Sequence, residues 1–223
     1  MKVGLISDVH GNLIALEVVL DHLNHCDEIY CAGDVVGYYP FPNEVIELFK
    51  ENDIKSVMGN HDYAVVTGDF FGFNVYAREA GEWTRKHLKE ENLDWLMNLP
   101  LSIETEWFNI YHGMPADDLR ALEEYIFPED PRIEYSLEEL EKNVVVGHTH
   151  IQFVKWHKGL FFANPGSVGQ PRDGDPRSAF AIYDTEKNEI ELRRVEYNIQ
   201  EVYEAVIEAG LPEFLGERLF RGY

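Results

Sequence analysis

The amino-acid sequence predicts an α/β protein whose second half is rich in β-strands. The first half alternates short apolar runs with segments in which apolar residues recur at helical spacing, whereas short apolar runs dominate from residue 144 onward. No internal repeat, low-complexity linker or break in composition divides the 223 residues. We therefore expect one domain spanning residues 1–223, which is long enough to bury a full core.

Elements of the first half are expected in the order strand, helix, strand, helix, strand. The strands are KVGLIS (2–7), EIYCA (28–32) and IKSVM (54–58), and the helices are NLIALEVVLDHLN (12–24) and NEVIELFKEN (43–52). This order implies parallel strands joined by right-handed crossovers.

The middle of the chain has a segment with helical spacing followed by a segment that predicts strands. Residues 74–98 have helical spacing, which places Trp83, Leu88 and Trp95 at buried positions. Residues 101–113 predict two strands.

An acidic stretch at 116–142 predicts helices packed over or beside a functional site. Further strands are expected at 144–146, 151–157, 160–163, 179–184 and 189–195. The last helix is expected at 198–210, with Gly210 at its carboxyl cap.

Charge and composition restrict the possible partners. Acidic residues number 41 and basic residues 19, which gives a formal net charge of −22. Such a surface repels polyanions, so we expect no binding to nucleic-acid polymers or anionic membranes. A small phosphorylated substrate would need local positive charge, which a bound metal could supply.

Two cysteines, Cys26 and Cys31, lie in or beside apolar segments and are expected to be reduced core residues. The amino-terminal apolar run is too short for a signal peptide, and no apolar stretch approaches the length of a membrane span, about 18 residues. These features predict a cytoplasmic protein.

Polar side chains that can bind metal directly follow five of the apolar runs. In chain order they are Asp8 and His10, Asp34, Asn60 and His61, His112, and His148 and His150. In an α/β sheet, functional groups gather at the carboxyl ends of strands. We therefore expect these side chains to converge although they span much of the chain.

Each of these residues alone has an ordinary structural explanation. An Asp or Asn after a strand is often a turn or helix-cap residue, and a lone His beside apolar sequence is often a hydrogen-bonded core residue. Five such strand ends favour metal, because carboxylates and imidazoles buried together without a cation are costly. The set exceeds the needs of one tetrahedral ion, so two ions with a shared carboxylate are expected. Such pairs promote in-line displacement at phosphorus.

The motif series SDVHGN, GDVVGY, GNHD, YHG and GHTH resembles the calcineurin-like metallophosphoesterase superfamily, in order from residue 5 to about residue 170. The segment NPGSVGQPRDGDPR (164–177) is similar to small prokaryotic phosphodiesterases related to dinucleoside tetraphosphatases. The resemblance implies a four-layer fold in which two mixed β-sheets pack face to face with helices outside.

The resemblance also implies a role for each motif residue. Asp8, His10 and His150 would bind the first of two divalent metal ions, Asn60, His112 and His148 the second, and Asp34 would bridge them. Manganese is the expected ion, with iron, zinc, nickel and cobalt as alternatives. A metal-bridging hydroxide would attack phosphorus, and His61 would protonate the leaving oxygen as a general acid of near-neutral pKa.

Two motifs depart from the protein Ser/Thr phosphatases of this superfamily, which carry GDxVDRG and RGNHE. The corresponding stretches here are GDVVGYY and MGNHD, so Gly37, Tyr38 and Met58 replace an aspartate and two arginines. Loss of two guanidinium groups favours a diester, which carries one charge, over a monoester dianion. It also leaves His61 without an assigned partner, for which Asp62 is a candidate.

Arg172, Arg177 and Tyr38 are the candidates for substrate contacts. The two arginines lie in a Gly/Pro-rich loop, where they would clamp a phosphate or form solvated Arg–Asp pairs. Asn164 and Ser167 are expected to fix this loop through turn hydrogen bonds or to support the metal ligands. Aromatic side chains that would stack a base or aryl group, or else pack in a cap, are Tyr38, Tyr39, Phe41, Phe70, Phe71 and Phe73.

The expected function is hydrolysis of a small phosphoester, a phosphodiester first of all. The alternatives are hydrolysis of dinucleoside polyphosphates or other nucleotides, for which few basic residues lie near the motifs, and phosphomonoester hydrolysis, with protein phosphatase activity last. A non-catalytic scaffold, like a retromer subunit on this fold, is the alternative from a different class. Retention of His61 and of every expected ligand argues against a scaffold. The sequence leaves the oligomeric state open.

Overall fold

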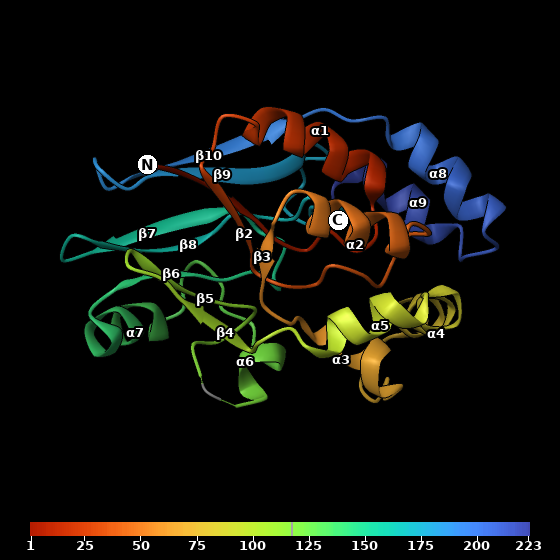
Figure 1. Cartoon of the computed structure of the whole chain (residues 1–223), viewed down its shortest axis with the longest axis horizontal. Helices are drawn as coiled ribbons and strands as arrows, with labels where there is room; N and C mark the ends of the chain where they lie inside the picture. Colours follow the sequence, from red (N-terminus) through yellow and green to blue (C-terminus); the bar gives the residue numbers. More distant parts are fainter. Residues whose placement is uncertain (117) are drawn as a thin grey trace.

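Two five-stranded β-sheets pack face to face with helices on the outside in the computed structural model, which describes residues 1–116 and 118–223 (Figure 1). Both sheets are mixed. This is the four-layer α/β arrangement that the family resemblance implied. The sheets place the carboxyl ends of several strands at one edge, where the predicted ligands follow them.

The first sheet contains the parallel start of the chain. Its strands are β1 (Lys2–Ile6), β2 (Glu28–Cys31), β3 (Lys55–Ser56), β9 (Ser178–Asp184) and β10 (Glu189–Val195), in the order β10-β9-β1-β2-β3. Parallel pairing of β1 with β2 and of β2 with β3 confirms the predicted parallel strands. The antiparallel pairs β1–β9 and β9–β10 complete the sheet.

The second sheet has three parallel strands in its centre. Its strands are β4 (Ser102–Glu104), β5 (Phe108–Tyr111), β6 (Asn143–Val145), β7 (Phe153–His157) and β8 (Leu160–Asn164), in the order β4-β5-β6-β8-β7. Strands β5, β6 and β8 are parallel, whereas the edge strands β4 and β7 pair antiparallel.

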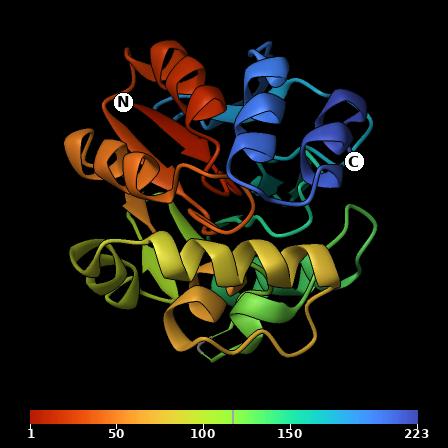
Figure 2. The same cartoon turned by 90° about the vertical axis from the view of Figure 1, so that its right-hand side faces the viewer.

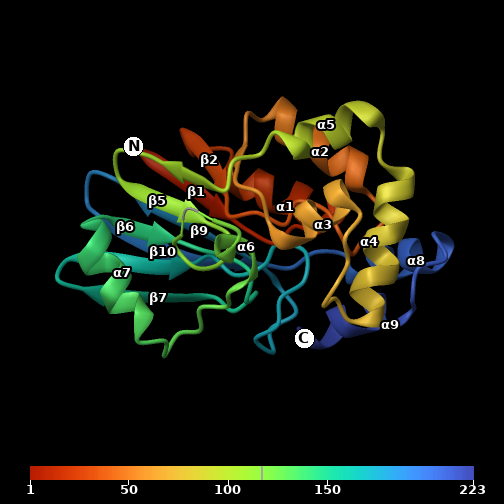
Figure 3. The same ribbon diagram turned by 90° about the horizontal axis from the view of Figure 1, so that it is seen from below.

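Helices cover both outer faces and one end of the sheets. They are α1 (Leu13–Leu23), α2 (Pro42–Glu51), α3 (Asn60–Thr67), α4 (Val75–His87), α5 (Glu90–Met97), α6 (Arg120–Glu123), α7 (Arg132–Leu140), α8 (Ile199–Glu208), α9 (Phe214–Glu217) and the 3-10 helix η1 (Arg218–Arg221). Helices α1 and α2 pack on the first sheet, and α6 and α7 on the second. Figures 2 and 3 show α4, α8 and α9 gathered at the end away from most strands, where they share a core.

One core lies between the sheets, and another lies between the first sheet and helices α1 and α2. Leu5 of β1 and Phe108 of β5 belong to one cluster with Phe161 of β8, and all three are fully buried. Strands buried on both faces explain why β1 and β6 read as continuous apolar runs rather than alternating ones. Burial of this apolar surface is the main stabilising contribution to such a fold.

The predicted helix at 74–98 is interrupted. Helices α4 and α5 are separate because Leu88 adopts an extended conformation, and the Asn43 side chain contacts both ends of the break. It donates to the His87 carbonyl at 2.9 Å and accepts from the Lys89 N–H at 2.9 Å. Trp83, Leu88 and Trp95 are half-buried rather than buried.

The sequence did not predict α3, α9 or η1. Helix α3 begins inside the GNHD motif, so its first residues were interpreted as site residues rather than as a helix start. Helices α9 and η1 span four residues each, too short for periodicity to show. None of the helices in the described part of the chain is long and apolar enough to cross a membrane.

Candidate metal centre

The seven predicted ligands lie in loops that directly follow β1, β2, β3, β5 and β6, except that Asn60 opens α3. Five of these residues have a left-handed backbone conformation, with φ between 53° and 66°: Asp8, His10, Asp34, His148 and His150. Non-glycine residues adopt this conformation rarely, and it concentrates at functional sites that the surrounding fold holds in place. The loops therefore turn sharply enough to direct these side chains toward each other.

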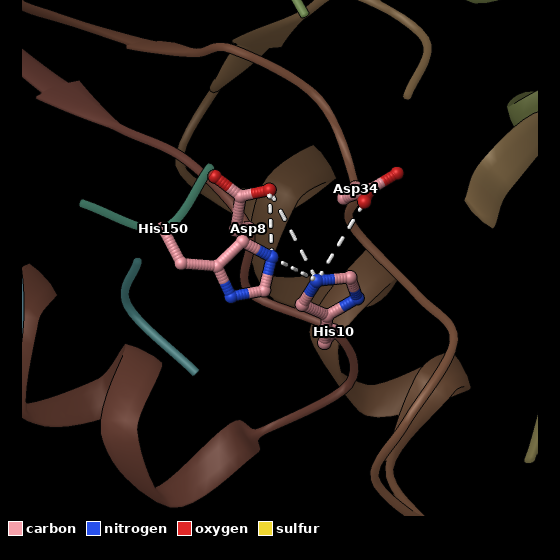
Figure 4. A group of neighbouring side chains, drawn as sticks. All are labelled: Asp8, His10, Asp34 and His150. Carbon is pink, nitrogen blue, oxygen red and sulfur yellow. Dashed lines mark hydrogen bonds and ion pairs between the residues drawn. The ribbon is translucent and has the colours of Figure 1, made fainter. Parts of the chain in front are cut away.

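The first ligand group consists of Asp8, His10, Asp34 and His150, all buried, with one ligand atom each within 4.8 Å of the others. Nε2 of His10 lies 3.1 Å from Nε2 of His150 and 3.6 Å from Oδ2 of Asp34. Nε2 of His150 lies 3.3 Å from Oδ1 of Asp8. Figure 4 shows the two imidazole rings and the Asp8 carboxylate facing one another, with Asp34 reaching in from its own loop.

The second ligand group shares Asp34 and adds His112 and His148. Nε2 of His112 lies 3.4 Å from Oδ2 of Asp34, 3.0 Å from Nδ1 of His148 and 3.0 Å from Oδ1 of Asn60. The same Asp34 oxygen thus approaches a histidine of each group. Asp34 therefore belongs to both ligand groups.

Hydrogen bonds to the backbone leave one nitrogen of each imidazole free for a metal. Nδ1 donates to the carbonyl of Val36 in His10, of Ala32 in His112 and of Gln170 in His150, and Nε2 of His148 donates to Glu123. The other nitrogen of each neutral ring then directs a lone pair into the cluster. The lone pairs of His10 and His150, on nitrogens 3.1 Å apart, repel each other unless a cation lies between them. The donor set therefore fits divalent metal ions.

Burial controls the protonation of the cluster without metal. It lowers the pKa of His10 and His150 well below the ordinary value and that of His148 to about 3, and raises the pKa of Asp8 to about 7. Burial opposes the charged forms of Asp34 and His112 too. The surrounding charged groups together outweigh burial. His112, His61 and His10 hold the pKa of Asp34 well below its ordinary value, and Asp34 and Asp8 raise the pKa of His112 to about 9. A metal ion would displace the His112 proton, because ligands bind deprotonated.

His61 lies beside the ligand groups and lines the pocket. Its ring centre is 4.7 Å from that of His10, 4.6 Å from Tyr38 and 4.8 Å from Phe73. Nδ1 of His61 has no hydrogen-bond partner among the described residues. Burial lowers its pKa to about 4, so the near-neutral pKa expected for a general acid is not found without metal and substrate.

Asp62 is not the partner of His61. Its carboxylate accepts hydrogen bonds from the backbone N–H groups of Val35, Val36 and Gly59, at 2.9–3.2 Å. It therefore points toward the Asp34 loop and fixes that loop's shape. A Cβ at Gly37 would lie 2.6 Å from Nδ1 of His61, so position 37 lies next to the ring but supplies no side chain to orient it.

A cavity of about 530 Å³ opens over the ligand groups. Its lining joins Asp34, Asn60, His61, His148 and His150 to Tyr38, Phe71, Phe73, Tyr125, Arg172 and Arg218, among others. The cavity is thus lined both by candidate metal ligands and by aromatic and cationic side chains. Its volume is typical of small-molecule sites.

The predicted substrate residues divide between the pocket and the surface. Arg172 and Tyr38 line the pocket, and Nη2 of Arg172 donates to the Tyr38 hydroxyl at 3.3 Å. Arg177 does not line it and instead pairs with Asp175 at 2.6 Å, which is the alternative interpretation of the loop.

The remaining candidates from the loop and the aromatic residues differ in location: some support the ligand loops, some line the pocket, and some lie outside it. Asn164 donates to the Gly147 carbonyl at 2.6 Å, and Ser167 donates to the Asp8 carbonyl at 2.7 Å, so both support the ligand loops.

Phe71 and Phe73 line the pocket. Phe70 packs against the core around α1 and α2, and Tyr39 lies in the core shared by α4, α8 and α9. Phe41 precedes α2 and does not line the pocket.

Tyr125 and Arg218 are pocket residues that the sequence analysis missed. Tyr125 stacks on the His148 ring, with centres 3.8 Å apart, and Arg218 reaches the pocket from η1. No signal in the sequence indicates either residue, because both lie in short segments without motif or periodicity. Arg218 adds a second guanidinium group to the pocket beside the predicted Arg172.

Known proteins share both the sequence pattern and the fold. Residues 1–188 match the family model of the calcineurin-like phosphoesterase superfamily domain. An uncharacterised protein of Methanocaldococcus jannaschii is 39% identical over 242 residues, covering 99% of this chain and 98% of that protein. A metallophosphoesterase structure from Sphaerobacter thermophilus has a TM-score of 0.86 and 35% identity, with both chains covered completely. A hypothetical protein from Pyrococcus horikoshii has a TM-score of 0.91 at 21% identity, covering 100% of this chain and 98% of the other, and shares the fold.

Proposed function

Because the chain belongs to the calcineurin-like phosphoesterase superfamily, and so to the metal-dependent phosphoester hydrolases, we propose that it hydrolyses a small phosphodiester with two divalent cations. The observation that carries the proposal is that the two ligand groups share Asp34 at the base of one pocket. Asp8, His10 and His150 would hold one cation, Asn60, His112 and His148 the other, and Asp34 both. Manganese is the expected ion. Cations bound there would polarise the phosphoryl oxygens and lower the pKa of a bound water.

His61 is placed to protonate the leaving oxygen. It lines the pocket beside the ligand groups without a hydrogen-bond partner at Nδ1 among the described residues. Its pKa of about 4 favours the neutral ring, but a phosphate anion bound next to it raises the pKa by stabilising the protonated form. The imidazolium then donates its proton as the bond to the leaving oxygen breaks.

A diester is favoured over a monoester by what surrounds the ligand groups. Tyr38 and Met58 supply no cationic group where the protein phosphatases of this superfamily have arginines, and Met58 does not line the pocket. Arg172 and Arg218 are nevertheless in the pocket, and this specific observation favours nucleotide polyphosphates as the second candidate substrates.

A panel of phosphoesters tests the proposal. Bis(p-nitrophenyl) phosphate, p-nitrophenyl phosphate and diadenosine tetraphosphate would be assayed with manganese, iron, zinc, nickel and cobalt at fixed ionic strength. We expect faster turnover of the diester than of the monoester. Equal rates on the two would refute the diester preference, and a metal-loaded protein inert toward all three would support a scaffold.

A further inference from the structure

We propose that Arg172 and Arg218 form a second anion site in the pocket, which binds a charged group of the substrate next to the phosphate that is cleaved. The proposal rests on the phosphoesterase function proposed above. It names the substrate class as phosphoesters or phosphoanhydrides that carry a further phosphate or carboxylate. Arg218 would be a specificity-determining residue contributed from outside the part of the chain that matches the family model.

The two arginines are unusual in this acidic chain. With a net charge of −22, carboxylates neutralise most guanidinium groups. Arginines paired with a carboxylate are Arg78, Arg120, Arg132, Arg177, Arg193 and Arg194. Among the described residues, neither Arg172 nor Arg218 pairs with a side-chain carboxylate. Arg85 and Arg221 also lack such a partner, but neither of them lines the cavity. Arg172 and Arg218 are half-buried and line the same cavity.

The Tyr38 ring lies near both guanidinium groups. The Arg172 Cζ lies 5.8 Å from the centre of the Tyr38 ring, and the Arg218 Cζ lies 6.0 Å from it. Burial and the positive charge of Arg172 lower the pKa of Arg218. Two like charges that line one partly buried pocket repel each other, and an anion bound within reach of both reduces that repulsion.

Donor atoms remain available in both side chains. Arg172 donates Nε and Nη2 to Gln170 and Tyr38, and Arg218 donates Nε to the carbonyl of Tyr223. Nη1 of Arg172 and both Nη atoms of Arg218 donate to no other described residue. Three free N–H-bearing atoms on two guanidinium groups are suited to a phosphate or carboxylate.

A buried hydrogen-bond chain fixes the site in advance. Gln170 holds Arg172 at 2.7 Å and donates to the Tyr39 hydroxyl at 3.0 Å. Tyr39 donates in turn to the Leu215 carbonyl of α9, at 3.2 Å, just before Arg218. The loop that carries Arg172 and the segment that carries Arg218 are thus tied together by Gln170 and Tyr39, which are fully buried.

The site adjoins the position of the cleaved phosphate. The Tyr38 ring that both arginines approach also contacts His61, with ring centres 4.6 Å apart, and His10, at 4.7 Å. One aromatic ring therefore separates the arginines from the proposed general acid. A group bound there belongs to the same substrate molecule as the phosphate over the metal ligands.

Binding of inorganic pyrophosphate to the metal-free protein tests the site without relying on catalysis. Calorimetry would compare the parent with Arg218→Gln, Arg218→Lys and the control Arg221→Gln, which alters the same 3-10 helix outside the pocket. We expect Arg218→Gln to weaken binding about tenfold, Arg218→Lys to weaken it less, and Arg221→Gln to change it less than about twofold. Thermal unfolding would confirm that each variant folds. Equal affinity of parent and folded Arg218→Gln, or no pyrophosphate binding by the parent, would overturn the proposal.

Kinetics on the metal-loaded enzyme separate this proposal from the proposed function. The measured quantity is the ratio of kcat/KM for diadenosine tetraphosphate to that for bis(p-nitrophenyl) phosphate. In Arg218→Gln this ratio should fall about tenfold, because only the former carries extra charged groups. An active enzyme whose ratio is unchanged would refute the anion site alone. A protein that cleaves no phosphoester but binds pyrophosphate through Arg218 would refute the proposed function and support the site.

Discussion

The base and the wall of the pocket are built in different ways. The metal floor is the set of candidate ligands that follow the strands: Asp8, His10, Asp34, Asn60, His112, His148 and His150. Asp34, Asn60, His148 and His150 line the pocket, and the other three are fully buried beside them. The pocket wall consists of Tyr38, Phe71, Phe73, Tyr125, Arg172 and Arg218, which come from longer connections and from η1. Floor residues are held by the edges of two sheets, whereas the wall is held by contacts between segments distant in sequence. Under the proposed function, the floor would carry out the reaction and the wall would select the substrate.

Replacement of the shared carboxylate should have the largest effect. Asp34→Asn removes the negative charge that both ligand groups use, so we expect loss of both metals and a fall in turnover of about a thousandfold or more. Metal analysis and assay with bis(p-nitrophenyl) phosphate measure the two effects. Retention of two tightly bound ions would show that the floor does not depend on Asp34.

Removal of the proposed general acid should act on turnover alone. His61→Ala should lower kcat about a hundredfold while metal content stays at the parent value, because His61 lies beside the ligands and is not among them. His157→Ala, at a surface histidine paired with Glu138, is the matched control. Loss of metal from His61→Ala would assign the residue to the floor instead.

Weakening the support of the Asp34 loop should give an intermediate effect. Asp62→Asn leaves fewer acceptors for three backbone N–H groups and should cost about 1–3 kcal/mol of unfolding free energy, with weaker metal binding. Urea unfolding of the metal-free protein measures the first and metal titration the second. The surface variant Asp94→Asn provides the comparison. An unchanged unfolding midpoint would contradict the role assigned to Asp62.

The smallest effect is expected for the arginine outside the wall. The hydrogen bond from Arg177 lowers the pKa of Asp175 to about 2, so this pair stabilises the fold above the ordinary aspartate pKa of 3.8 and loses that contribution as the pH falls through about 2. Arg177→Gln should raise the pKa of Asp175, change the unfolding free energy little near neutral pH because the pair is exposed to solvent, and leave kcat/KM unchanged. An NMR titration of Asp175 and the phosphoester assay test both statements. A large loss of activity would place Arg177 in the wall.

The floor could be predicted from the sequence because its signal is local. Each ligand directly follows an apolar run, and parallel strands bring such positions to one edge of a sheet. The place of Asp34 in both ligand groups was expected from the family resemblance, because the strand-end pattern alone does not say which carboxylate is shared.

The wall could not be predicted because tertiary packing alone brings its parts together. Arg218 reaches the pocket through the Tyr39 hydrogen bond to α9, and Tyr125 reaches it by stacking on His148. Neither contact leaves a periodic or motif signal. The same limitation explains the missed break at Leu88, which depends on the distant Asn43 side chain.

The left-handed backbone at five of the floor residues has a consequence for how ions are captured. Those turns are unfavourable locally and are maintained by strands, loops and hydrogen bonds that form when the polypeptide folds. Ions would therefore enter a binding site whose shape is already set, and the protein would lose little conformational entropy when they bind. The choice between ions would then depend on their coordination preference rather than on refolding.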